Sequence, residues 1–289
     1  MWGLLPLYWP LLEPARPLEI LAHRVVWSLA VVVALVLGLR GRAWLRAVSR
    51  RRLGLLAIAS VLLTANWGLY IYAVNDHRVV ETSLGYFINP LVTVALGVLV
   101  LKERLTRAQR AAMAVATAAV VVLTADYGHP PWIALALAFS FATYGLIKKR
   151  VDLDAMESLS IETAAVALPA LGYLVWLGQS GHSTVTSQGA GHLALLVGAG
   201  VMTAVPLLCF GAAAVRIPLV TLGLLQFLAP VLQFAIGVGV RGEPMPPARI
   251  AGFALVWAAI TIFAADALRR TRAQTAANRC SMGRSLEWT

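Results

Sequence analysis

Long apolar runs separated by short polar segments make up most of this chain. In a helix, about 20 apolar residues span the roughly 30 Å hydrocarbon core of a bilayer. Nine runs reach or nearly reach this length, at 19–39, 54–74, 80–101, 109–125, 131–147, 157–177, 192–213, 219–240 and 248–267. Each run is continuously apolar and does not alternate with a period of two. The pattern therefore predicts transmembrane helices rather than the strands of a barrel.

The second half of the chain repeats the first at an offset of 140 residues. Residues 19–126 align without a gap with residues 159–266. The alignment pairs Pro90 with Pro230, Gly97 with Gly237, Glu103 with Glu243 and Phe87 with Phe227. An uninterrupted register over this length, with Pro and Glu among the matches, indicates a duplicated membrane protein, which is an architecture typical of transporters.

A tenth run, 2–12, predicts the remainder of a shortened first helix. Trp2-Gly-Leu-Leu resembles Tyr144-Gly-Leu-Ile at the end of the run 131–147, so residues 131–142 have no counterpart in the first half. We therefore expect an all-α integral membrane protein with ten transmembrane helices, the first of them truncated. The expected boundaries are 1–127 and 128–268 for two five-helix repeats and 269–289 for a basic, disordered cytoplasmic tail.

The basic residues predict the orientation of these helices. An odd number of helices per repeat makes the two repeats antiparallel, so both termini lie on the same side. If that side is cytoplasmic, the loops and tail facing it hold 19 Lys and Arg residues, and the opposite loops hold four. This asymmetry follows the positive-inside rule and predicts that both ends lie in the cytoplasm, with an external loop at 178–191.

Composition supports the membrane class and excludes several others. The chain is 60% hydrophobic and 13% charged, whereas soluble domains carry about 25% charged residues. The net charge of +11 comes from residues clustered between the apolar runs, which indicates topology signals and not a nucleic-acid surface. The two cysteines, Cys209 and Cys280, suggest neither a disulfide framework nor a metal site, and no cofactor is expected.

Several segments also carry a family resemblance. They are Glu19-Ile-Leu-Ala-His-Arg-Val-Val-Trp-Ser, Ser83-Leu-Gly-Tyr-Phe-Ile-Asn-Pro-Leu and Leu222-Gly-Leu-Leu-Gln-Phe-Leu-Ala-Pro. Together they resemble the RarD branch of the EamA group, in the drug/metabolite transporter superfamily. The resemblance runs from Trp2 to about Leu268 and implies a ten-helix permease of the inner membrane, with each half an EamA-type unit. It implies the substrate only loosely.

A repeated polar face on the fourth and ninth helices is the first candidate site. Its members are Tyr86, Asn89 and Thr93 in the first repeat and Gln226 and Gln233 in the second, with Pro90 and Pro230 placed to bend the helices. Polar groups in hydrocarbon are costly, so we expect this face to line a substrate cavity with Tyr86 opposite Gln226. The alternative is that these side chains only hold the two halves together.

Asn66 and Tyr70, one turn apart beside Trp67 on the third helix, are further cavity candidates. Amphipathic aromatic residues suit a site for planar organic molecules. The alternative for these residues is interfacial anchoring, which fits residues at span ends better.

Charged residues inside the runs are candidates for ion coupling or charge pairing. Glu19, His23 and Arg24 lie within about a turn of one another in the second helix, where they partly neutralise each other. Glu162 lies one turn inside the seventh helix, where it could couple to protons or pair with the basic loop that begins at Lys148. Glu103 and Glu243, at the ends of helices four and nine, are expected to be structural caps or gate pairs.

These features favour a secondary transporter that exports or exchanges small organic metabolites or drugs, and not an enzyme. The expected partners are the lipid bilayer and a small-molecule substrate; the sequence leaves a homodimer open. The chain has no Gly-x-x-x-x-Gly-Lys-Ser/Thr loop for ATP. A membrane-embedded lipid enzyme would need paired acids or His clusters, and the close pair Asp152 and Asp154 lies in a basic loop. A non-transporting membrane scaffold is the remaining alternative.

Overall fold

The computed structural model describes residues 1–39, 48–75, 79–125 and 131–240, and, near the C-terminus, residues 247, 250–252, 254–266 and 269. The side chains of a few helix residues, Gln233 among them, also lie outside this description. The chain divides into two compact units: unit 1 comprises 1–103 and 129–244, and unit 2 comprises 104–128 and 245–289.

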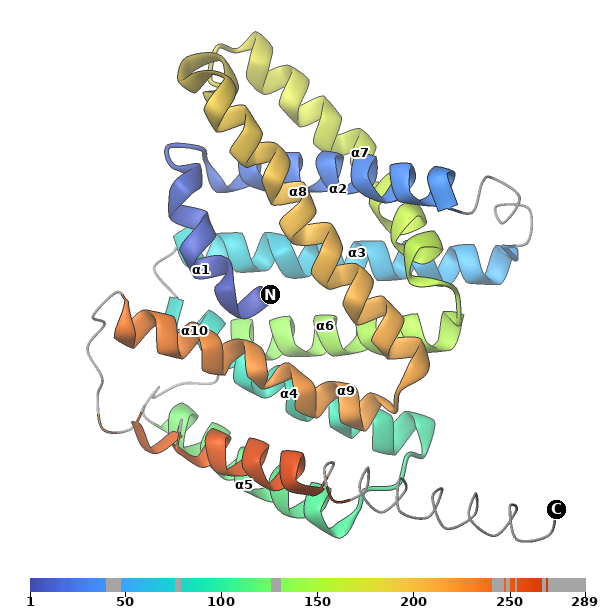
Figure 1. The fold of residues 1–289 in the computed structure, drawn as a ribbon, viewed down its shortest axis with the longest axis vertical. Coiled ribbons are helices and arrows are strands. Elements are labelled where there is room, and N and C mark those ends of the chain that lie inside the picture. The colour runs from blue at the N-terminus through green and yellow to red at the C-terminus, as the bar shows by residue number, and fades with distance from the viewer. Residues whose placement is uncertain are drawn as a thin grey trace, which may run out of the picture. The chain divides into compact units, whose positions relative to one another are not determined.

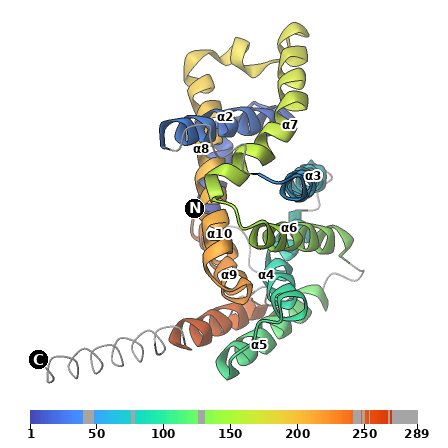
Figure 2. The same ribbon diagram turned by 90° about the vertical axis from the view of Figure 1, so that its right-hand side faces the viewer.

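The described residues form helices and no strands. The elements are η1 (Trp2–Leu4), α1 (Leu5–Tyr8), η2 (Trp9–Leu12), α2 (Pro17–Leu39), α3 (Arg50–Asn75), α4 (Val79–Leu101), α5 (Arg107–Ala125), α6 (Trp132–Val151), α7 (Ala155–Gln179), α8 (Thr184–Arg216), α9 (Leu219–Gln226) and α10 (Leu228–Gly239). A further helical segment covers most of residues 250–266. Figures 1 and 2 show the helices of unit 1 from two directions.

Six of the described helices are long and apolar enough to cross a membrane, namely α2, most of α3, most of α4, α5, α7 and α8. The expected count of ten is therefore not reached by length and hydropathy alone. The run 2–12 forms three short turns, since Pro6 and Pro10 both interrupt its hydrogen bonding. The run 219–240 is divided at Phe227 into α9 and α10.

In unit 1, α2 packs against α7 and α8 (Figure 1). Helices α2 and α8 approach closely at Gly200, where an added Cβ would collide with the backbone between Trp27 and Ser28. Ser28 donates a hydrogen bond from Oγ to the Gly200 carbonyl over 2.9 Å. A small residue on α8 thus lets the two helices meet at backbone distance, as is common in membrane helix packing.

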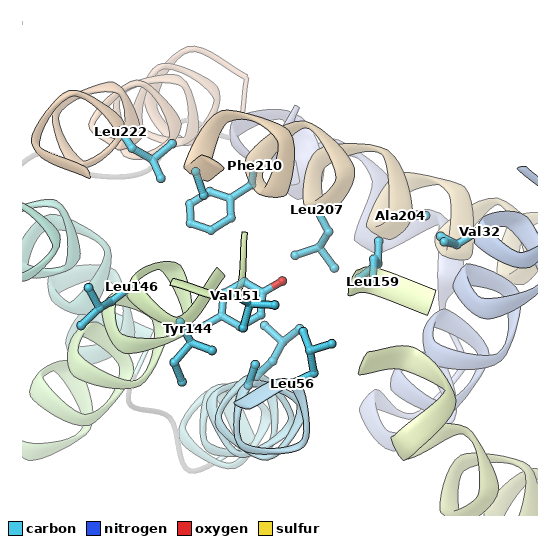
Figure 3. Packing of buried hydrophobic residues seen from close by; sticks show 14 of the residues in the cluster. Val32, Leu56, Tyr144, Leu146, Val151, Leu159, Ala204, Leu207, Phe210 and Leu222 are labelled. Carbon is cyan, nitrogen blue, oxygen red and sulfur yellow. The ribbon is translucent and has the colours of Figure 1, made fainter. Parts of the chain in front are cut away.

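The main apolar core lies around α6, between α3, α7 and α8. Figure 3 shows Tyr144 and Phe210 facing each other, with Leu56 and Leu207 close by. The rings of Tyr144 and Phe210 stack with centroids 5.9 Å apart. Several large side chains on the outer faces of these helices, such as Leu168 at 78% exposure, are exposed, as expected for surfaces that meet lipid.

Helices α4 and α9 meet through small residues and a helix cap. A Cβ added to Gly223 would lie within 3.1 Å of atoms of Pro90, Thr93 and Val94. The Glu103 carboxylate, just beyond the end of α4, accepts hydrogen bonds of 2.8 Å from the backbone amides of Leu219 and Val220 at the start of α9. This is the cap role, in which an acid satisfies free amides at a helix N-terminus. The expected counterpart, Glu243, lies outside the described residues.

The two ends of α7 connect differently. At its start, Asp152 has a left-handed conformation that ends α6, and the Asp154 side chain accepts a hydrogen bond from the Met156 amide. At its end the connection to α8 is much shorter than the expected loop 178–191, because residues from Thr184 onward are already helical. Gly189, with φ of 79°, marks the kink where the long part of α8 begins.

In unit 2, α5 and the segment 250–266 run antiparallel. The Thr106 hydroxyl, one residue before α5, donates a 3.2 Å hydrogen bond to the carboxylate of Asp266, at the end of the other helix. At the opposite end, Gly252 faces the side chain of Leu123 closely enough that an added Cβ would collide with it. The two helices form an antiparallel pair.

Candidate functional site

Arg24 on α2 is the centre of a polar and aromatic cluster inside unit 1. Its Nε donates a 2.8 Å hydrogen bond to the Thr203 hydroxyl on α8. Its Cζ lies 4.9 Å from the centre of the Trp9 ring and 4.8 Å from that of Trp67 on α3, which are cation–π distances. Arg24 was expected to pair with other charges, but within the described residues no carboxylate lies within 4.0 Å of it.

Two tyrosines extend this cluster toward α4. Tyr70 on α3 and Tyr86 on α4 lie edge to face, with ring centroids 6.1 Å apart. Both tyrosines lie within electrostatic range of the Arg24 guanidinium. We call Arg24, Trp9, Trp67, Tyr70, Tyr86 and Thr203 the Arg24 cluster. It brings together side chains from four helices and the N-terminal turns.

Asn89 lies one turn beyond Tyr86 on α4 and faces Gln226 at the end of α9. Its Nδ2 donates a 2.5 Å hydrogen bond to Gln226 Oε1. The other two amide atoms, Asn89 Oδ1 and Gln226 Nε2, are buried and have no hydrogen-bond partner among the described residues. We expected Tyr86 opposite Gln226, but the structure places Asn89 there, because Tyr86 turns toward Tyr70 on α3.

Two other candidate residues take part in helix packing. Asn66 donates from Nδ2 to the Leu137 carbonyl and to the Ser140 hydroxyl of α6, both over 2.8 Å, so it joins α3 to α6. Thr93 is 1% exposed and donates to the Asn89 carbonyl of its own helix. The Asn66 amide and the Thr93 hydroxyl thus donate their hydrogens to oxygens within the protein, at the α3–α6 contact and within α4.

The two prolines and Gln233 complete the repeated face. Pro90 is buried within a continuous α4. Pro230 is also buried, and it lies three residues after the division between α9 and α10 at Phe227. A proline cannot donate to the carbonyl four residues earlier, which for Pro230 is Gln226. Gln233 lies on α10, and its side chain is outside the described part of the chain.

Glu19 and His23 form a buried cluster next to the Arg24 cluster, at the end of α2 that faces the α7–α8 turn. Glu19 Oε1 accepts hydrogen bonds from the Thr184 amide and hydroxyl and from the Ser183 hydroxyl, so it caps the start of α8. His192 Nε2 lies 2.9 Å from the Thr184 hydroxyl. Glu19 Oε2 and His23 Nε2 are buried without a partner in the described residues.

Glu162 lies in the first half of α7, away from the α7–α8 turn. It belongs to a network in which both charged side chains are paired. Lys148 Nζ lies 2.9 Å from Glu162 Oε1 and donates over 2.5 Å to the Ser158 hydroxyl. The Tyr144 hydroxyl donates over 3.0 Å to Glu162 Oε2. We call these four residues the Lys148 network. It corresponds to the pairing alternative for Glu162, although Lys148 lies within α6 and not in a loop.

Sequence reasoning missed Thr203 and Trp9 as partners of Arg24, and it named Lys148 only as part of a basic loop that could pair with Glu162. Thr203 had a usable signal, because it is the one hydroxyl residue in the apolar run 192–213 and an arginine within a span needs a partner. Lys148 was assigned to a basic loop because Lys149 and Arg150 follow it. Among the described residues, no group of three His, Cys, Asp or Glu side chains is placed to hold a metal ion.

Comparisons with known proteins define the family. The model of the EamA-like transporter family matches residues 1–125. Protein RarD of Streptomyces exfoliatus is 59% identical over 274 residues, covering 94% of this chain and 87% of the relative. Protein RarD of Escherichia coli strain K12 is 40% identical, covering 94% and 93%. A crystal structure with 20% identity has a similar fold, with a TM-score of 0.67 over 90% of this chain and 92% of that one.

The fold and these matches define a multi-pass helical membrane protein of a transporter family. The chain belongs to the EamA-like transporter family, among the relatives named RarD.

Proposed function

We propose that this protein is a secondary transporter that carries small organic metabolites or drugs across the cell membrane as an exporter or exchanger. The two repeats contribute α4 and α9 to one substrate cavity about a pseudo-two-fold axis. The observation that carries the proposal is the Asn89–Gln226 pair. It joins the two halves of the chain at a point where each amide keeps one buried hydrogen-bonding atom without a partner.

An unpartnered amide atom in hydrocarbon is costly, so a purely structural contact would favour a fully bonded pair or apolar residues. A polar solute passing between the halves can accept from Gln226 Nε2 and donate to Asn89 Oδ1. Pro230 leaves the Gln226 carbonyl without its helical donor at the same place. Among the described residues, we find no comparable feature that favours an enzyme or a non-transporting scaffold.

Transport by the full chain in proteoliposomes tests this function. Uptake of a panel of small organic solutes is measured with and without a proton gradient. For each solute that is carried, Gln226→Leu should reduce transport about ten-fold, because it removes the hydrogen bonds without opposing membrane insertion. Leu225→Ala, at the adjacent exposed position, is the matched control and should transport normally. Unchanged transport by Gln226→Leu together with Asn89→Leu would exclude the shared cavity.

The orientation is part of the same proposal, with both termini cytoplasmic and the α7–α8 turn outside. His182 and Asp152 are exposed residues beyond the two ends of α7. In a chain with Cys209 and Cys280 replaced by Ser, cysteine at position 182 should react with an impermeant thiol reagent added outside intact cells. Cysteine at position 152 should react only after the membrane is opened. The opposite labelling pattern would reverse the orientation.

A further inference from the structure

We infer that the Arg24 cluster is a binding site for the carboxylate of a small, planar organic anion. The inference rests on the proposed transport function and specifies the class of substrate. It starts from an imbalance in the hydrogen bonding of Arg24. The guanidinium has five N–H groups, and within the described residues one of them, on Nε, donates to a protein atom.

The geometry of the guanidinium leaves one edge free. Because Nε is directed to Thr203, the edge formed by Nη1 and Nη2 is the one that remains. Neither nitrogen is among the fully buried atoms without partners, and the Arg24 side chain as a whole is partly exposed. Two parallel N–H groups on such an edge match the two oxygens of a carboxylate, which arginine binds with paired hydrogen bonds.

The charge of Arg24 also calls for a counter-charge. Its neighbours in the described chain are two indole rings, a hydroxyl and two tyrosines, and none of them carries a negative charge at neutral pH. Glu19, five residues earlier on α2, directs Oε1 to Ser183 and Thr184. Cation–π contacts stabilise the cation in part, and an organic anion would supply the missing charge.

The walls of the cluster select the rest of the ligand. Trp9, Trp67, Tyr70 and Tyr86 offer ring faces and edges around the guanidinium, which favour a flat, largely apolar body. The Lys148 network provides a contrast in the same unit. Lys148 is 3% exposed and is paired with Glu162, so it has no accessible edge for a ligand.

Direct binding to the purified full chain tests the site without relying on transport. The probes are benzoate, benzamide and benzylamine, which share a planar ring and differ in charge. Their affinities are measured in detergent by calorimetry and by the shift of the melting temperature. Benzoate should bind at least about ten-fold more tightly than benzamide, since only the carboxylate forms charge-assisted bonds. Equal binding of benzoate and benzamide, or preference for benzylamine, would overturn the inference.

Variants of Arg24 locate the binding. Arg24→Gln should lower benzoate affinity about ten-fold or more, and Arg24→Lys should fall between this variant and the natural protein. Arg216→Gln, which removes an exposed cation at the end of α8, is the matched control and should bind benzoate normally. Full benzoate affinity in a folded Arg24→Gln protein would overturn the site. The three-probe comparison on the natural protein gives the answer if that variant does not fold.

The experiments distinguish a failure of the anion site from a failure of the transport function. Selective benzoate binding that requires Arg24, without transport of any solute, supports the anion site and contradicts the transport function. Transport of neutral or cationic solutes that is inhibited by Gln226→Leu, without benzoate binding, supports the transport function and overturns the anion site.

Discussion

The Arg24 cluster and the Lys148 network both hold a cation within the helices of unit 1, but they satisfy it to different degrees. Lys148 lies between a carboxylate and a hydroxyl, and the carboxylate has a second donor in Tyr144. Arg24 has one hydrogen bond, two indole rings and an accessible edge. A fully paired, buried network stabilises one arrangement of helices, whereas an incompletely paired one keeps capacity for a ligand.

Their positions reinforce this difference. The Lys148 network links α6 to α7 next to the short connection at Asp152, close to the apolar core around Tyr144. The Arg24 cluster gathers side chains from α2, α3, α4 and α8, together with a residue of the N-terminal turns. A site whose walls come from several helices changes shape when those helices move, as transport requires. We therefore expect substitutions in the network to affect folding and substitutions in the cluster to affect binding.

The largest predicted effect is at the Lys148 network. Lys148→Met leaves the buried Glu162 carboxylate without its counter-charge, which should destabilise the protein by about 3–5 kcal/mol. The double variant Lys148→Met with Glu162→Gln removes both charges and should recover most of the lost stability. Both effects are measured as melting temperatures of the detergent-purified proteins. The readout is the amount of protein that stays monodisperse after heating. If Lys148→Met melted like the natural protein, the network would not have the structural role assigned to it.

Glu19 is predicted to have an intermediate effect, because it combines both kinds of environment. Glu19→Ala removes the acceptor for Ser183 and Thr184 and should cost about 1–3 kcal/mol at the start of α8. Glu19→Gln keeps an oxygen at the same place and should cost less than about 1 kcal/mol. The same melting measurement compares the two variants. An equal loss for both would show that the charge of Glu19, rather than its accepting oxygen, stabilises this end.

The apolar runs predicted the helices well because each span must be apolar wherever it meets lipid. The starts and ends of α2, α4, α5 and α7 lie within a few residues of the expected runs. The breaks within the runs and the exact helix ends depend on packing, and they could not be predicted from the sequence. Gly189 allows the start of α8 to turn within the expected loop, and two prolines break the first run into short turns.

For the candidate site, the sequence indicates which residue types lie on which helix face, but it does not indicate which residues pair. Asn89 and Gln226 were both candidates, yet periodicity gives only the face of a helix and not which residue of the other helix it meets. Lys148 illustrates the limit more clearly. A lysine followed by Lys149 and Arg150 has the pattern of a basic loop, and only the approach of α7 shows that the first of the three is buried.

The smallest predicted effect is at Thr203, and it tests whether the Arg24 cluster tolerates the loss of a partner. Thr203→Val preserves the shape of the side chain but removes the oxygen that accepts from Arg24 Nε. The guanidinium keeps both indole rings and its accessible edge. The free energy of unfolding should therefore lie within about 1 kcal/mol of that of the natural protein. The looser guanidinium should weaken benzoate binding by about 1 kcal/mol, or roughly five-fold. Thr203→Ser retains the hydroxyl and should bind normally. A loss of stability for Thr203→Val as large as that of Lys148→Met would show that the two cations are held in the same way, and the contrast between the two regions would be wrong.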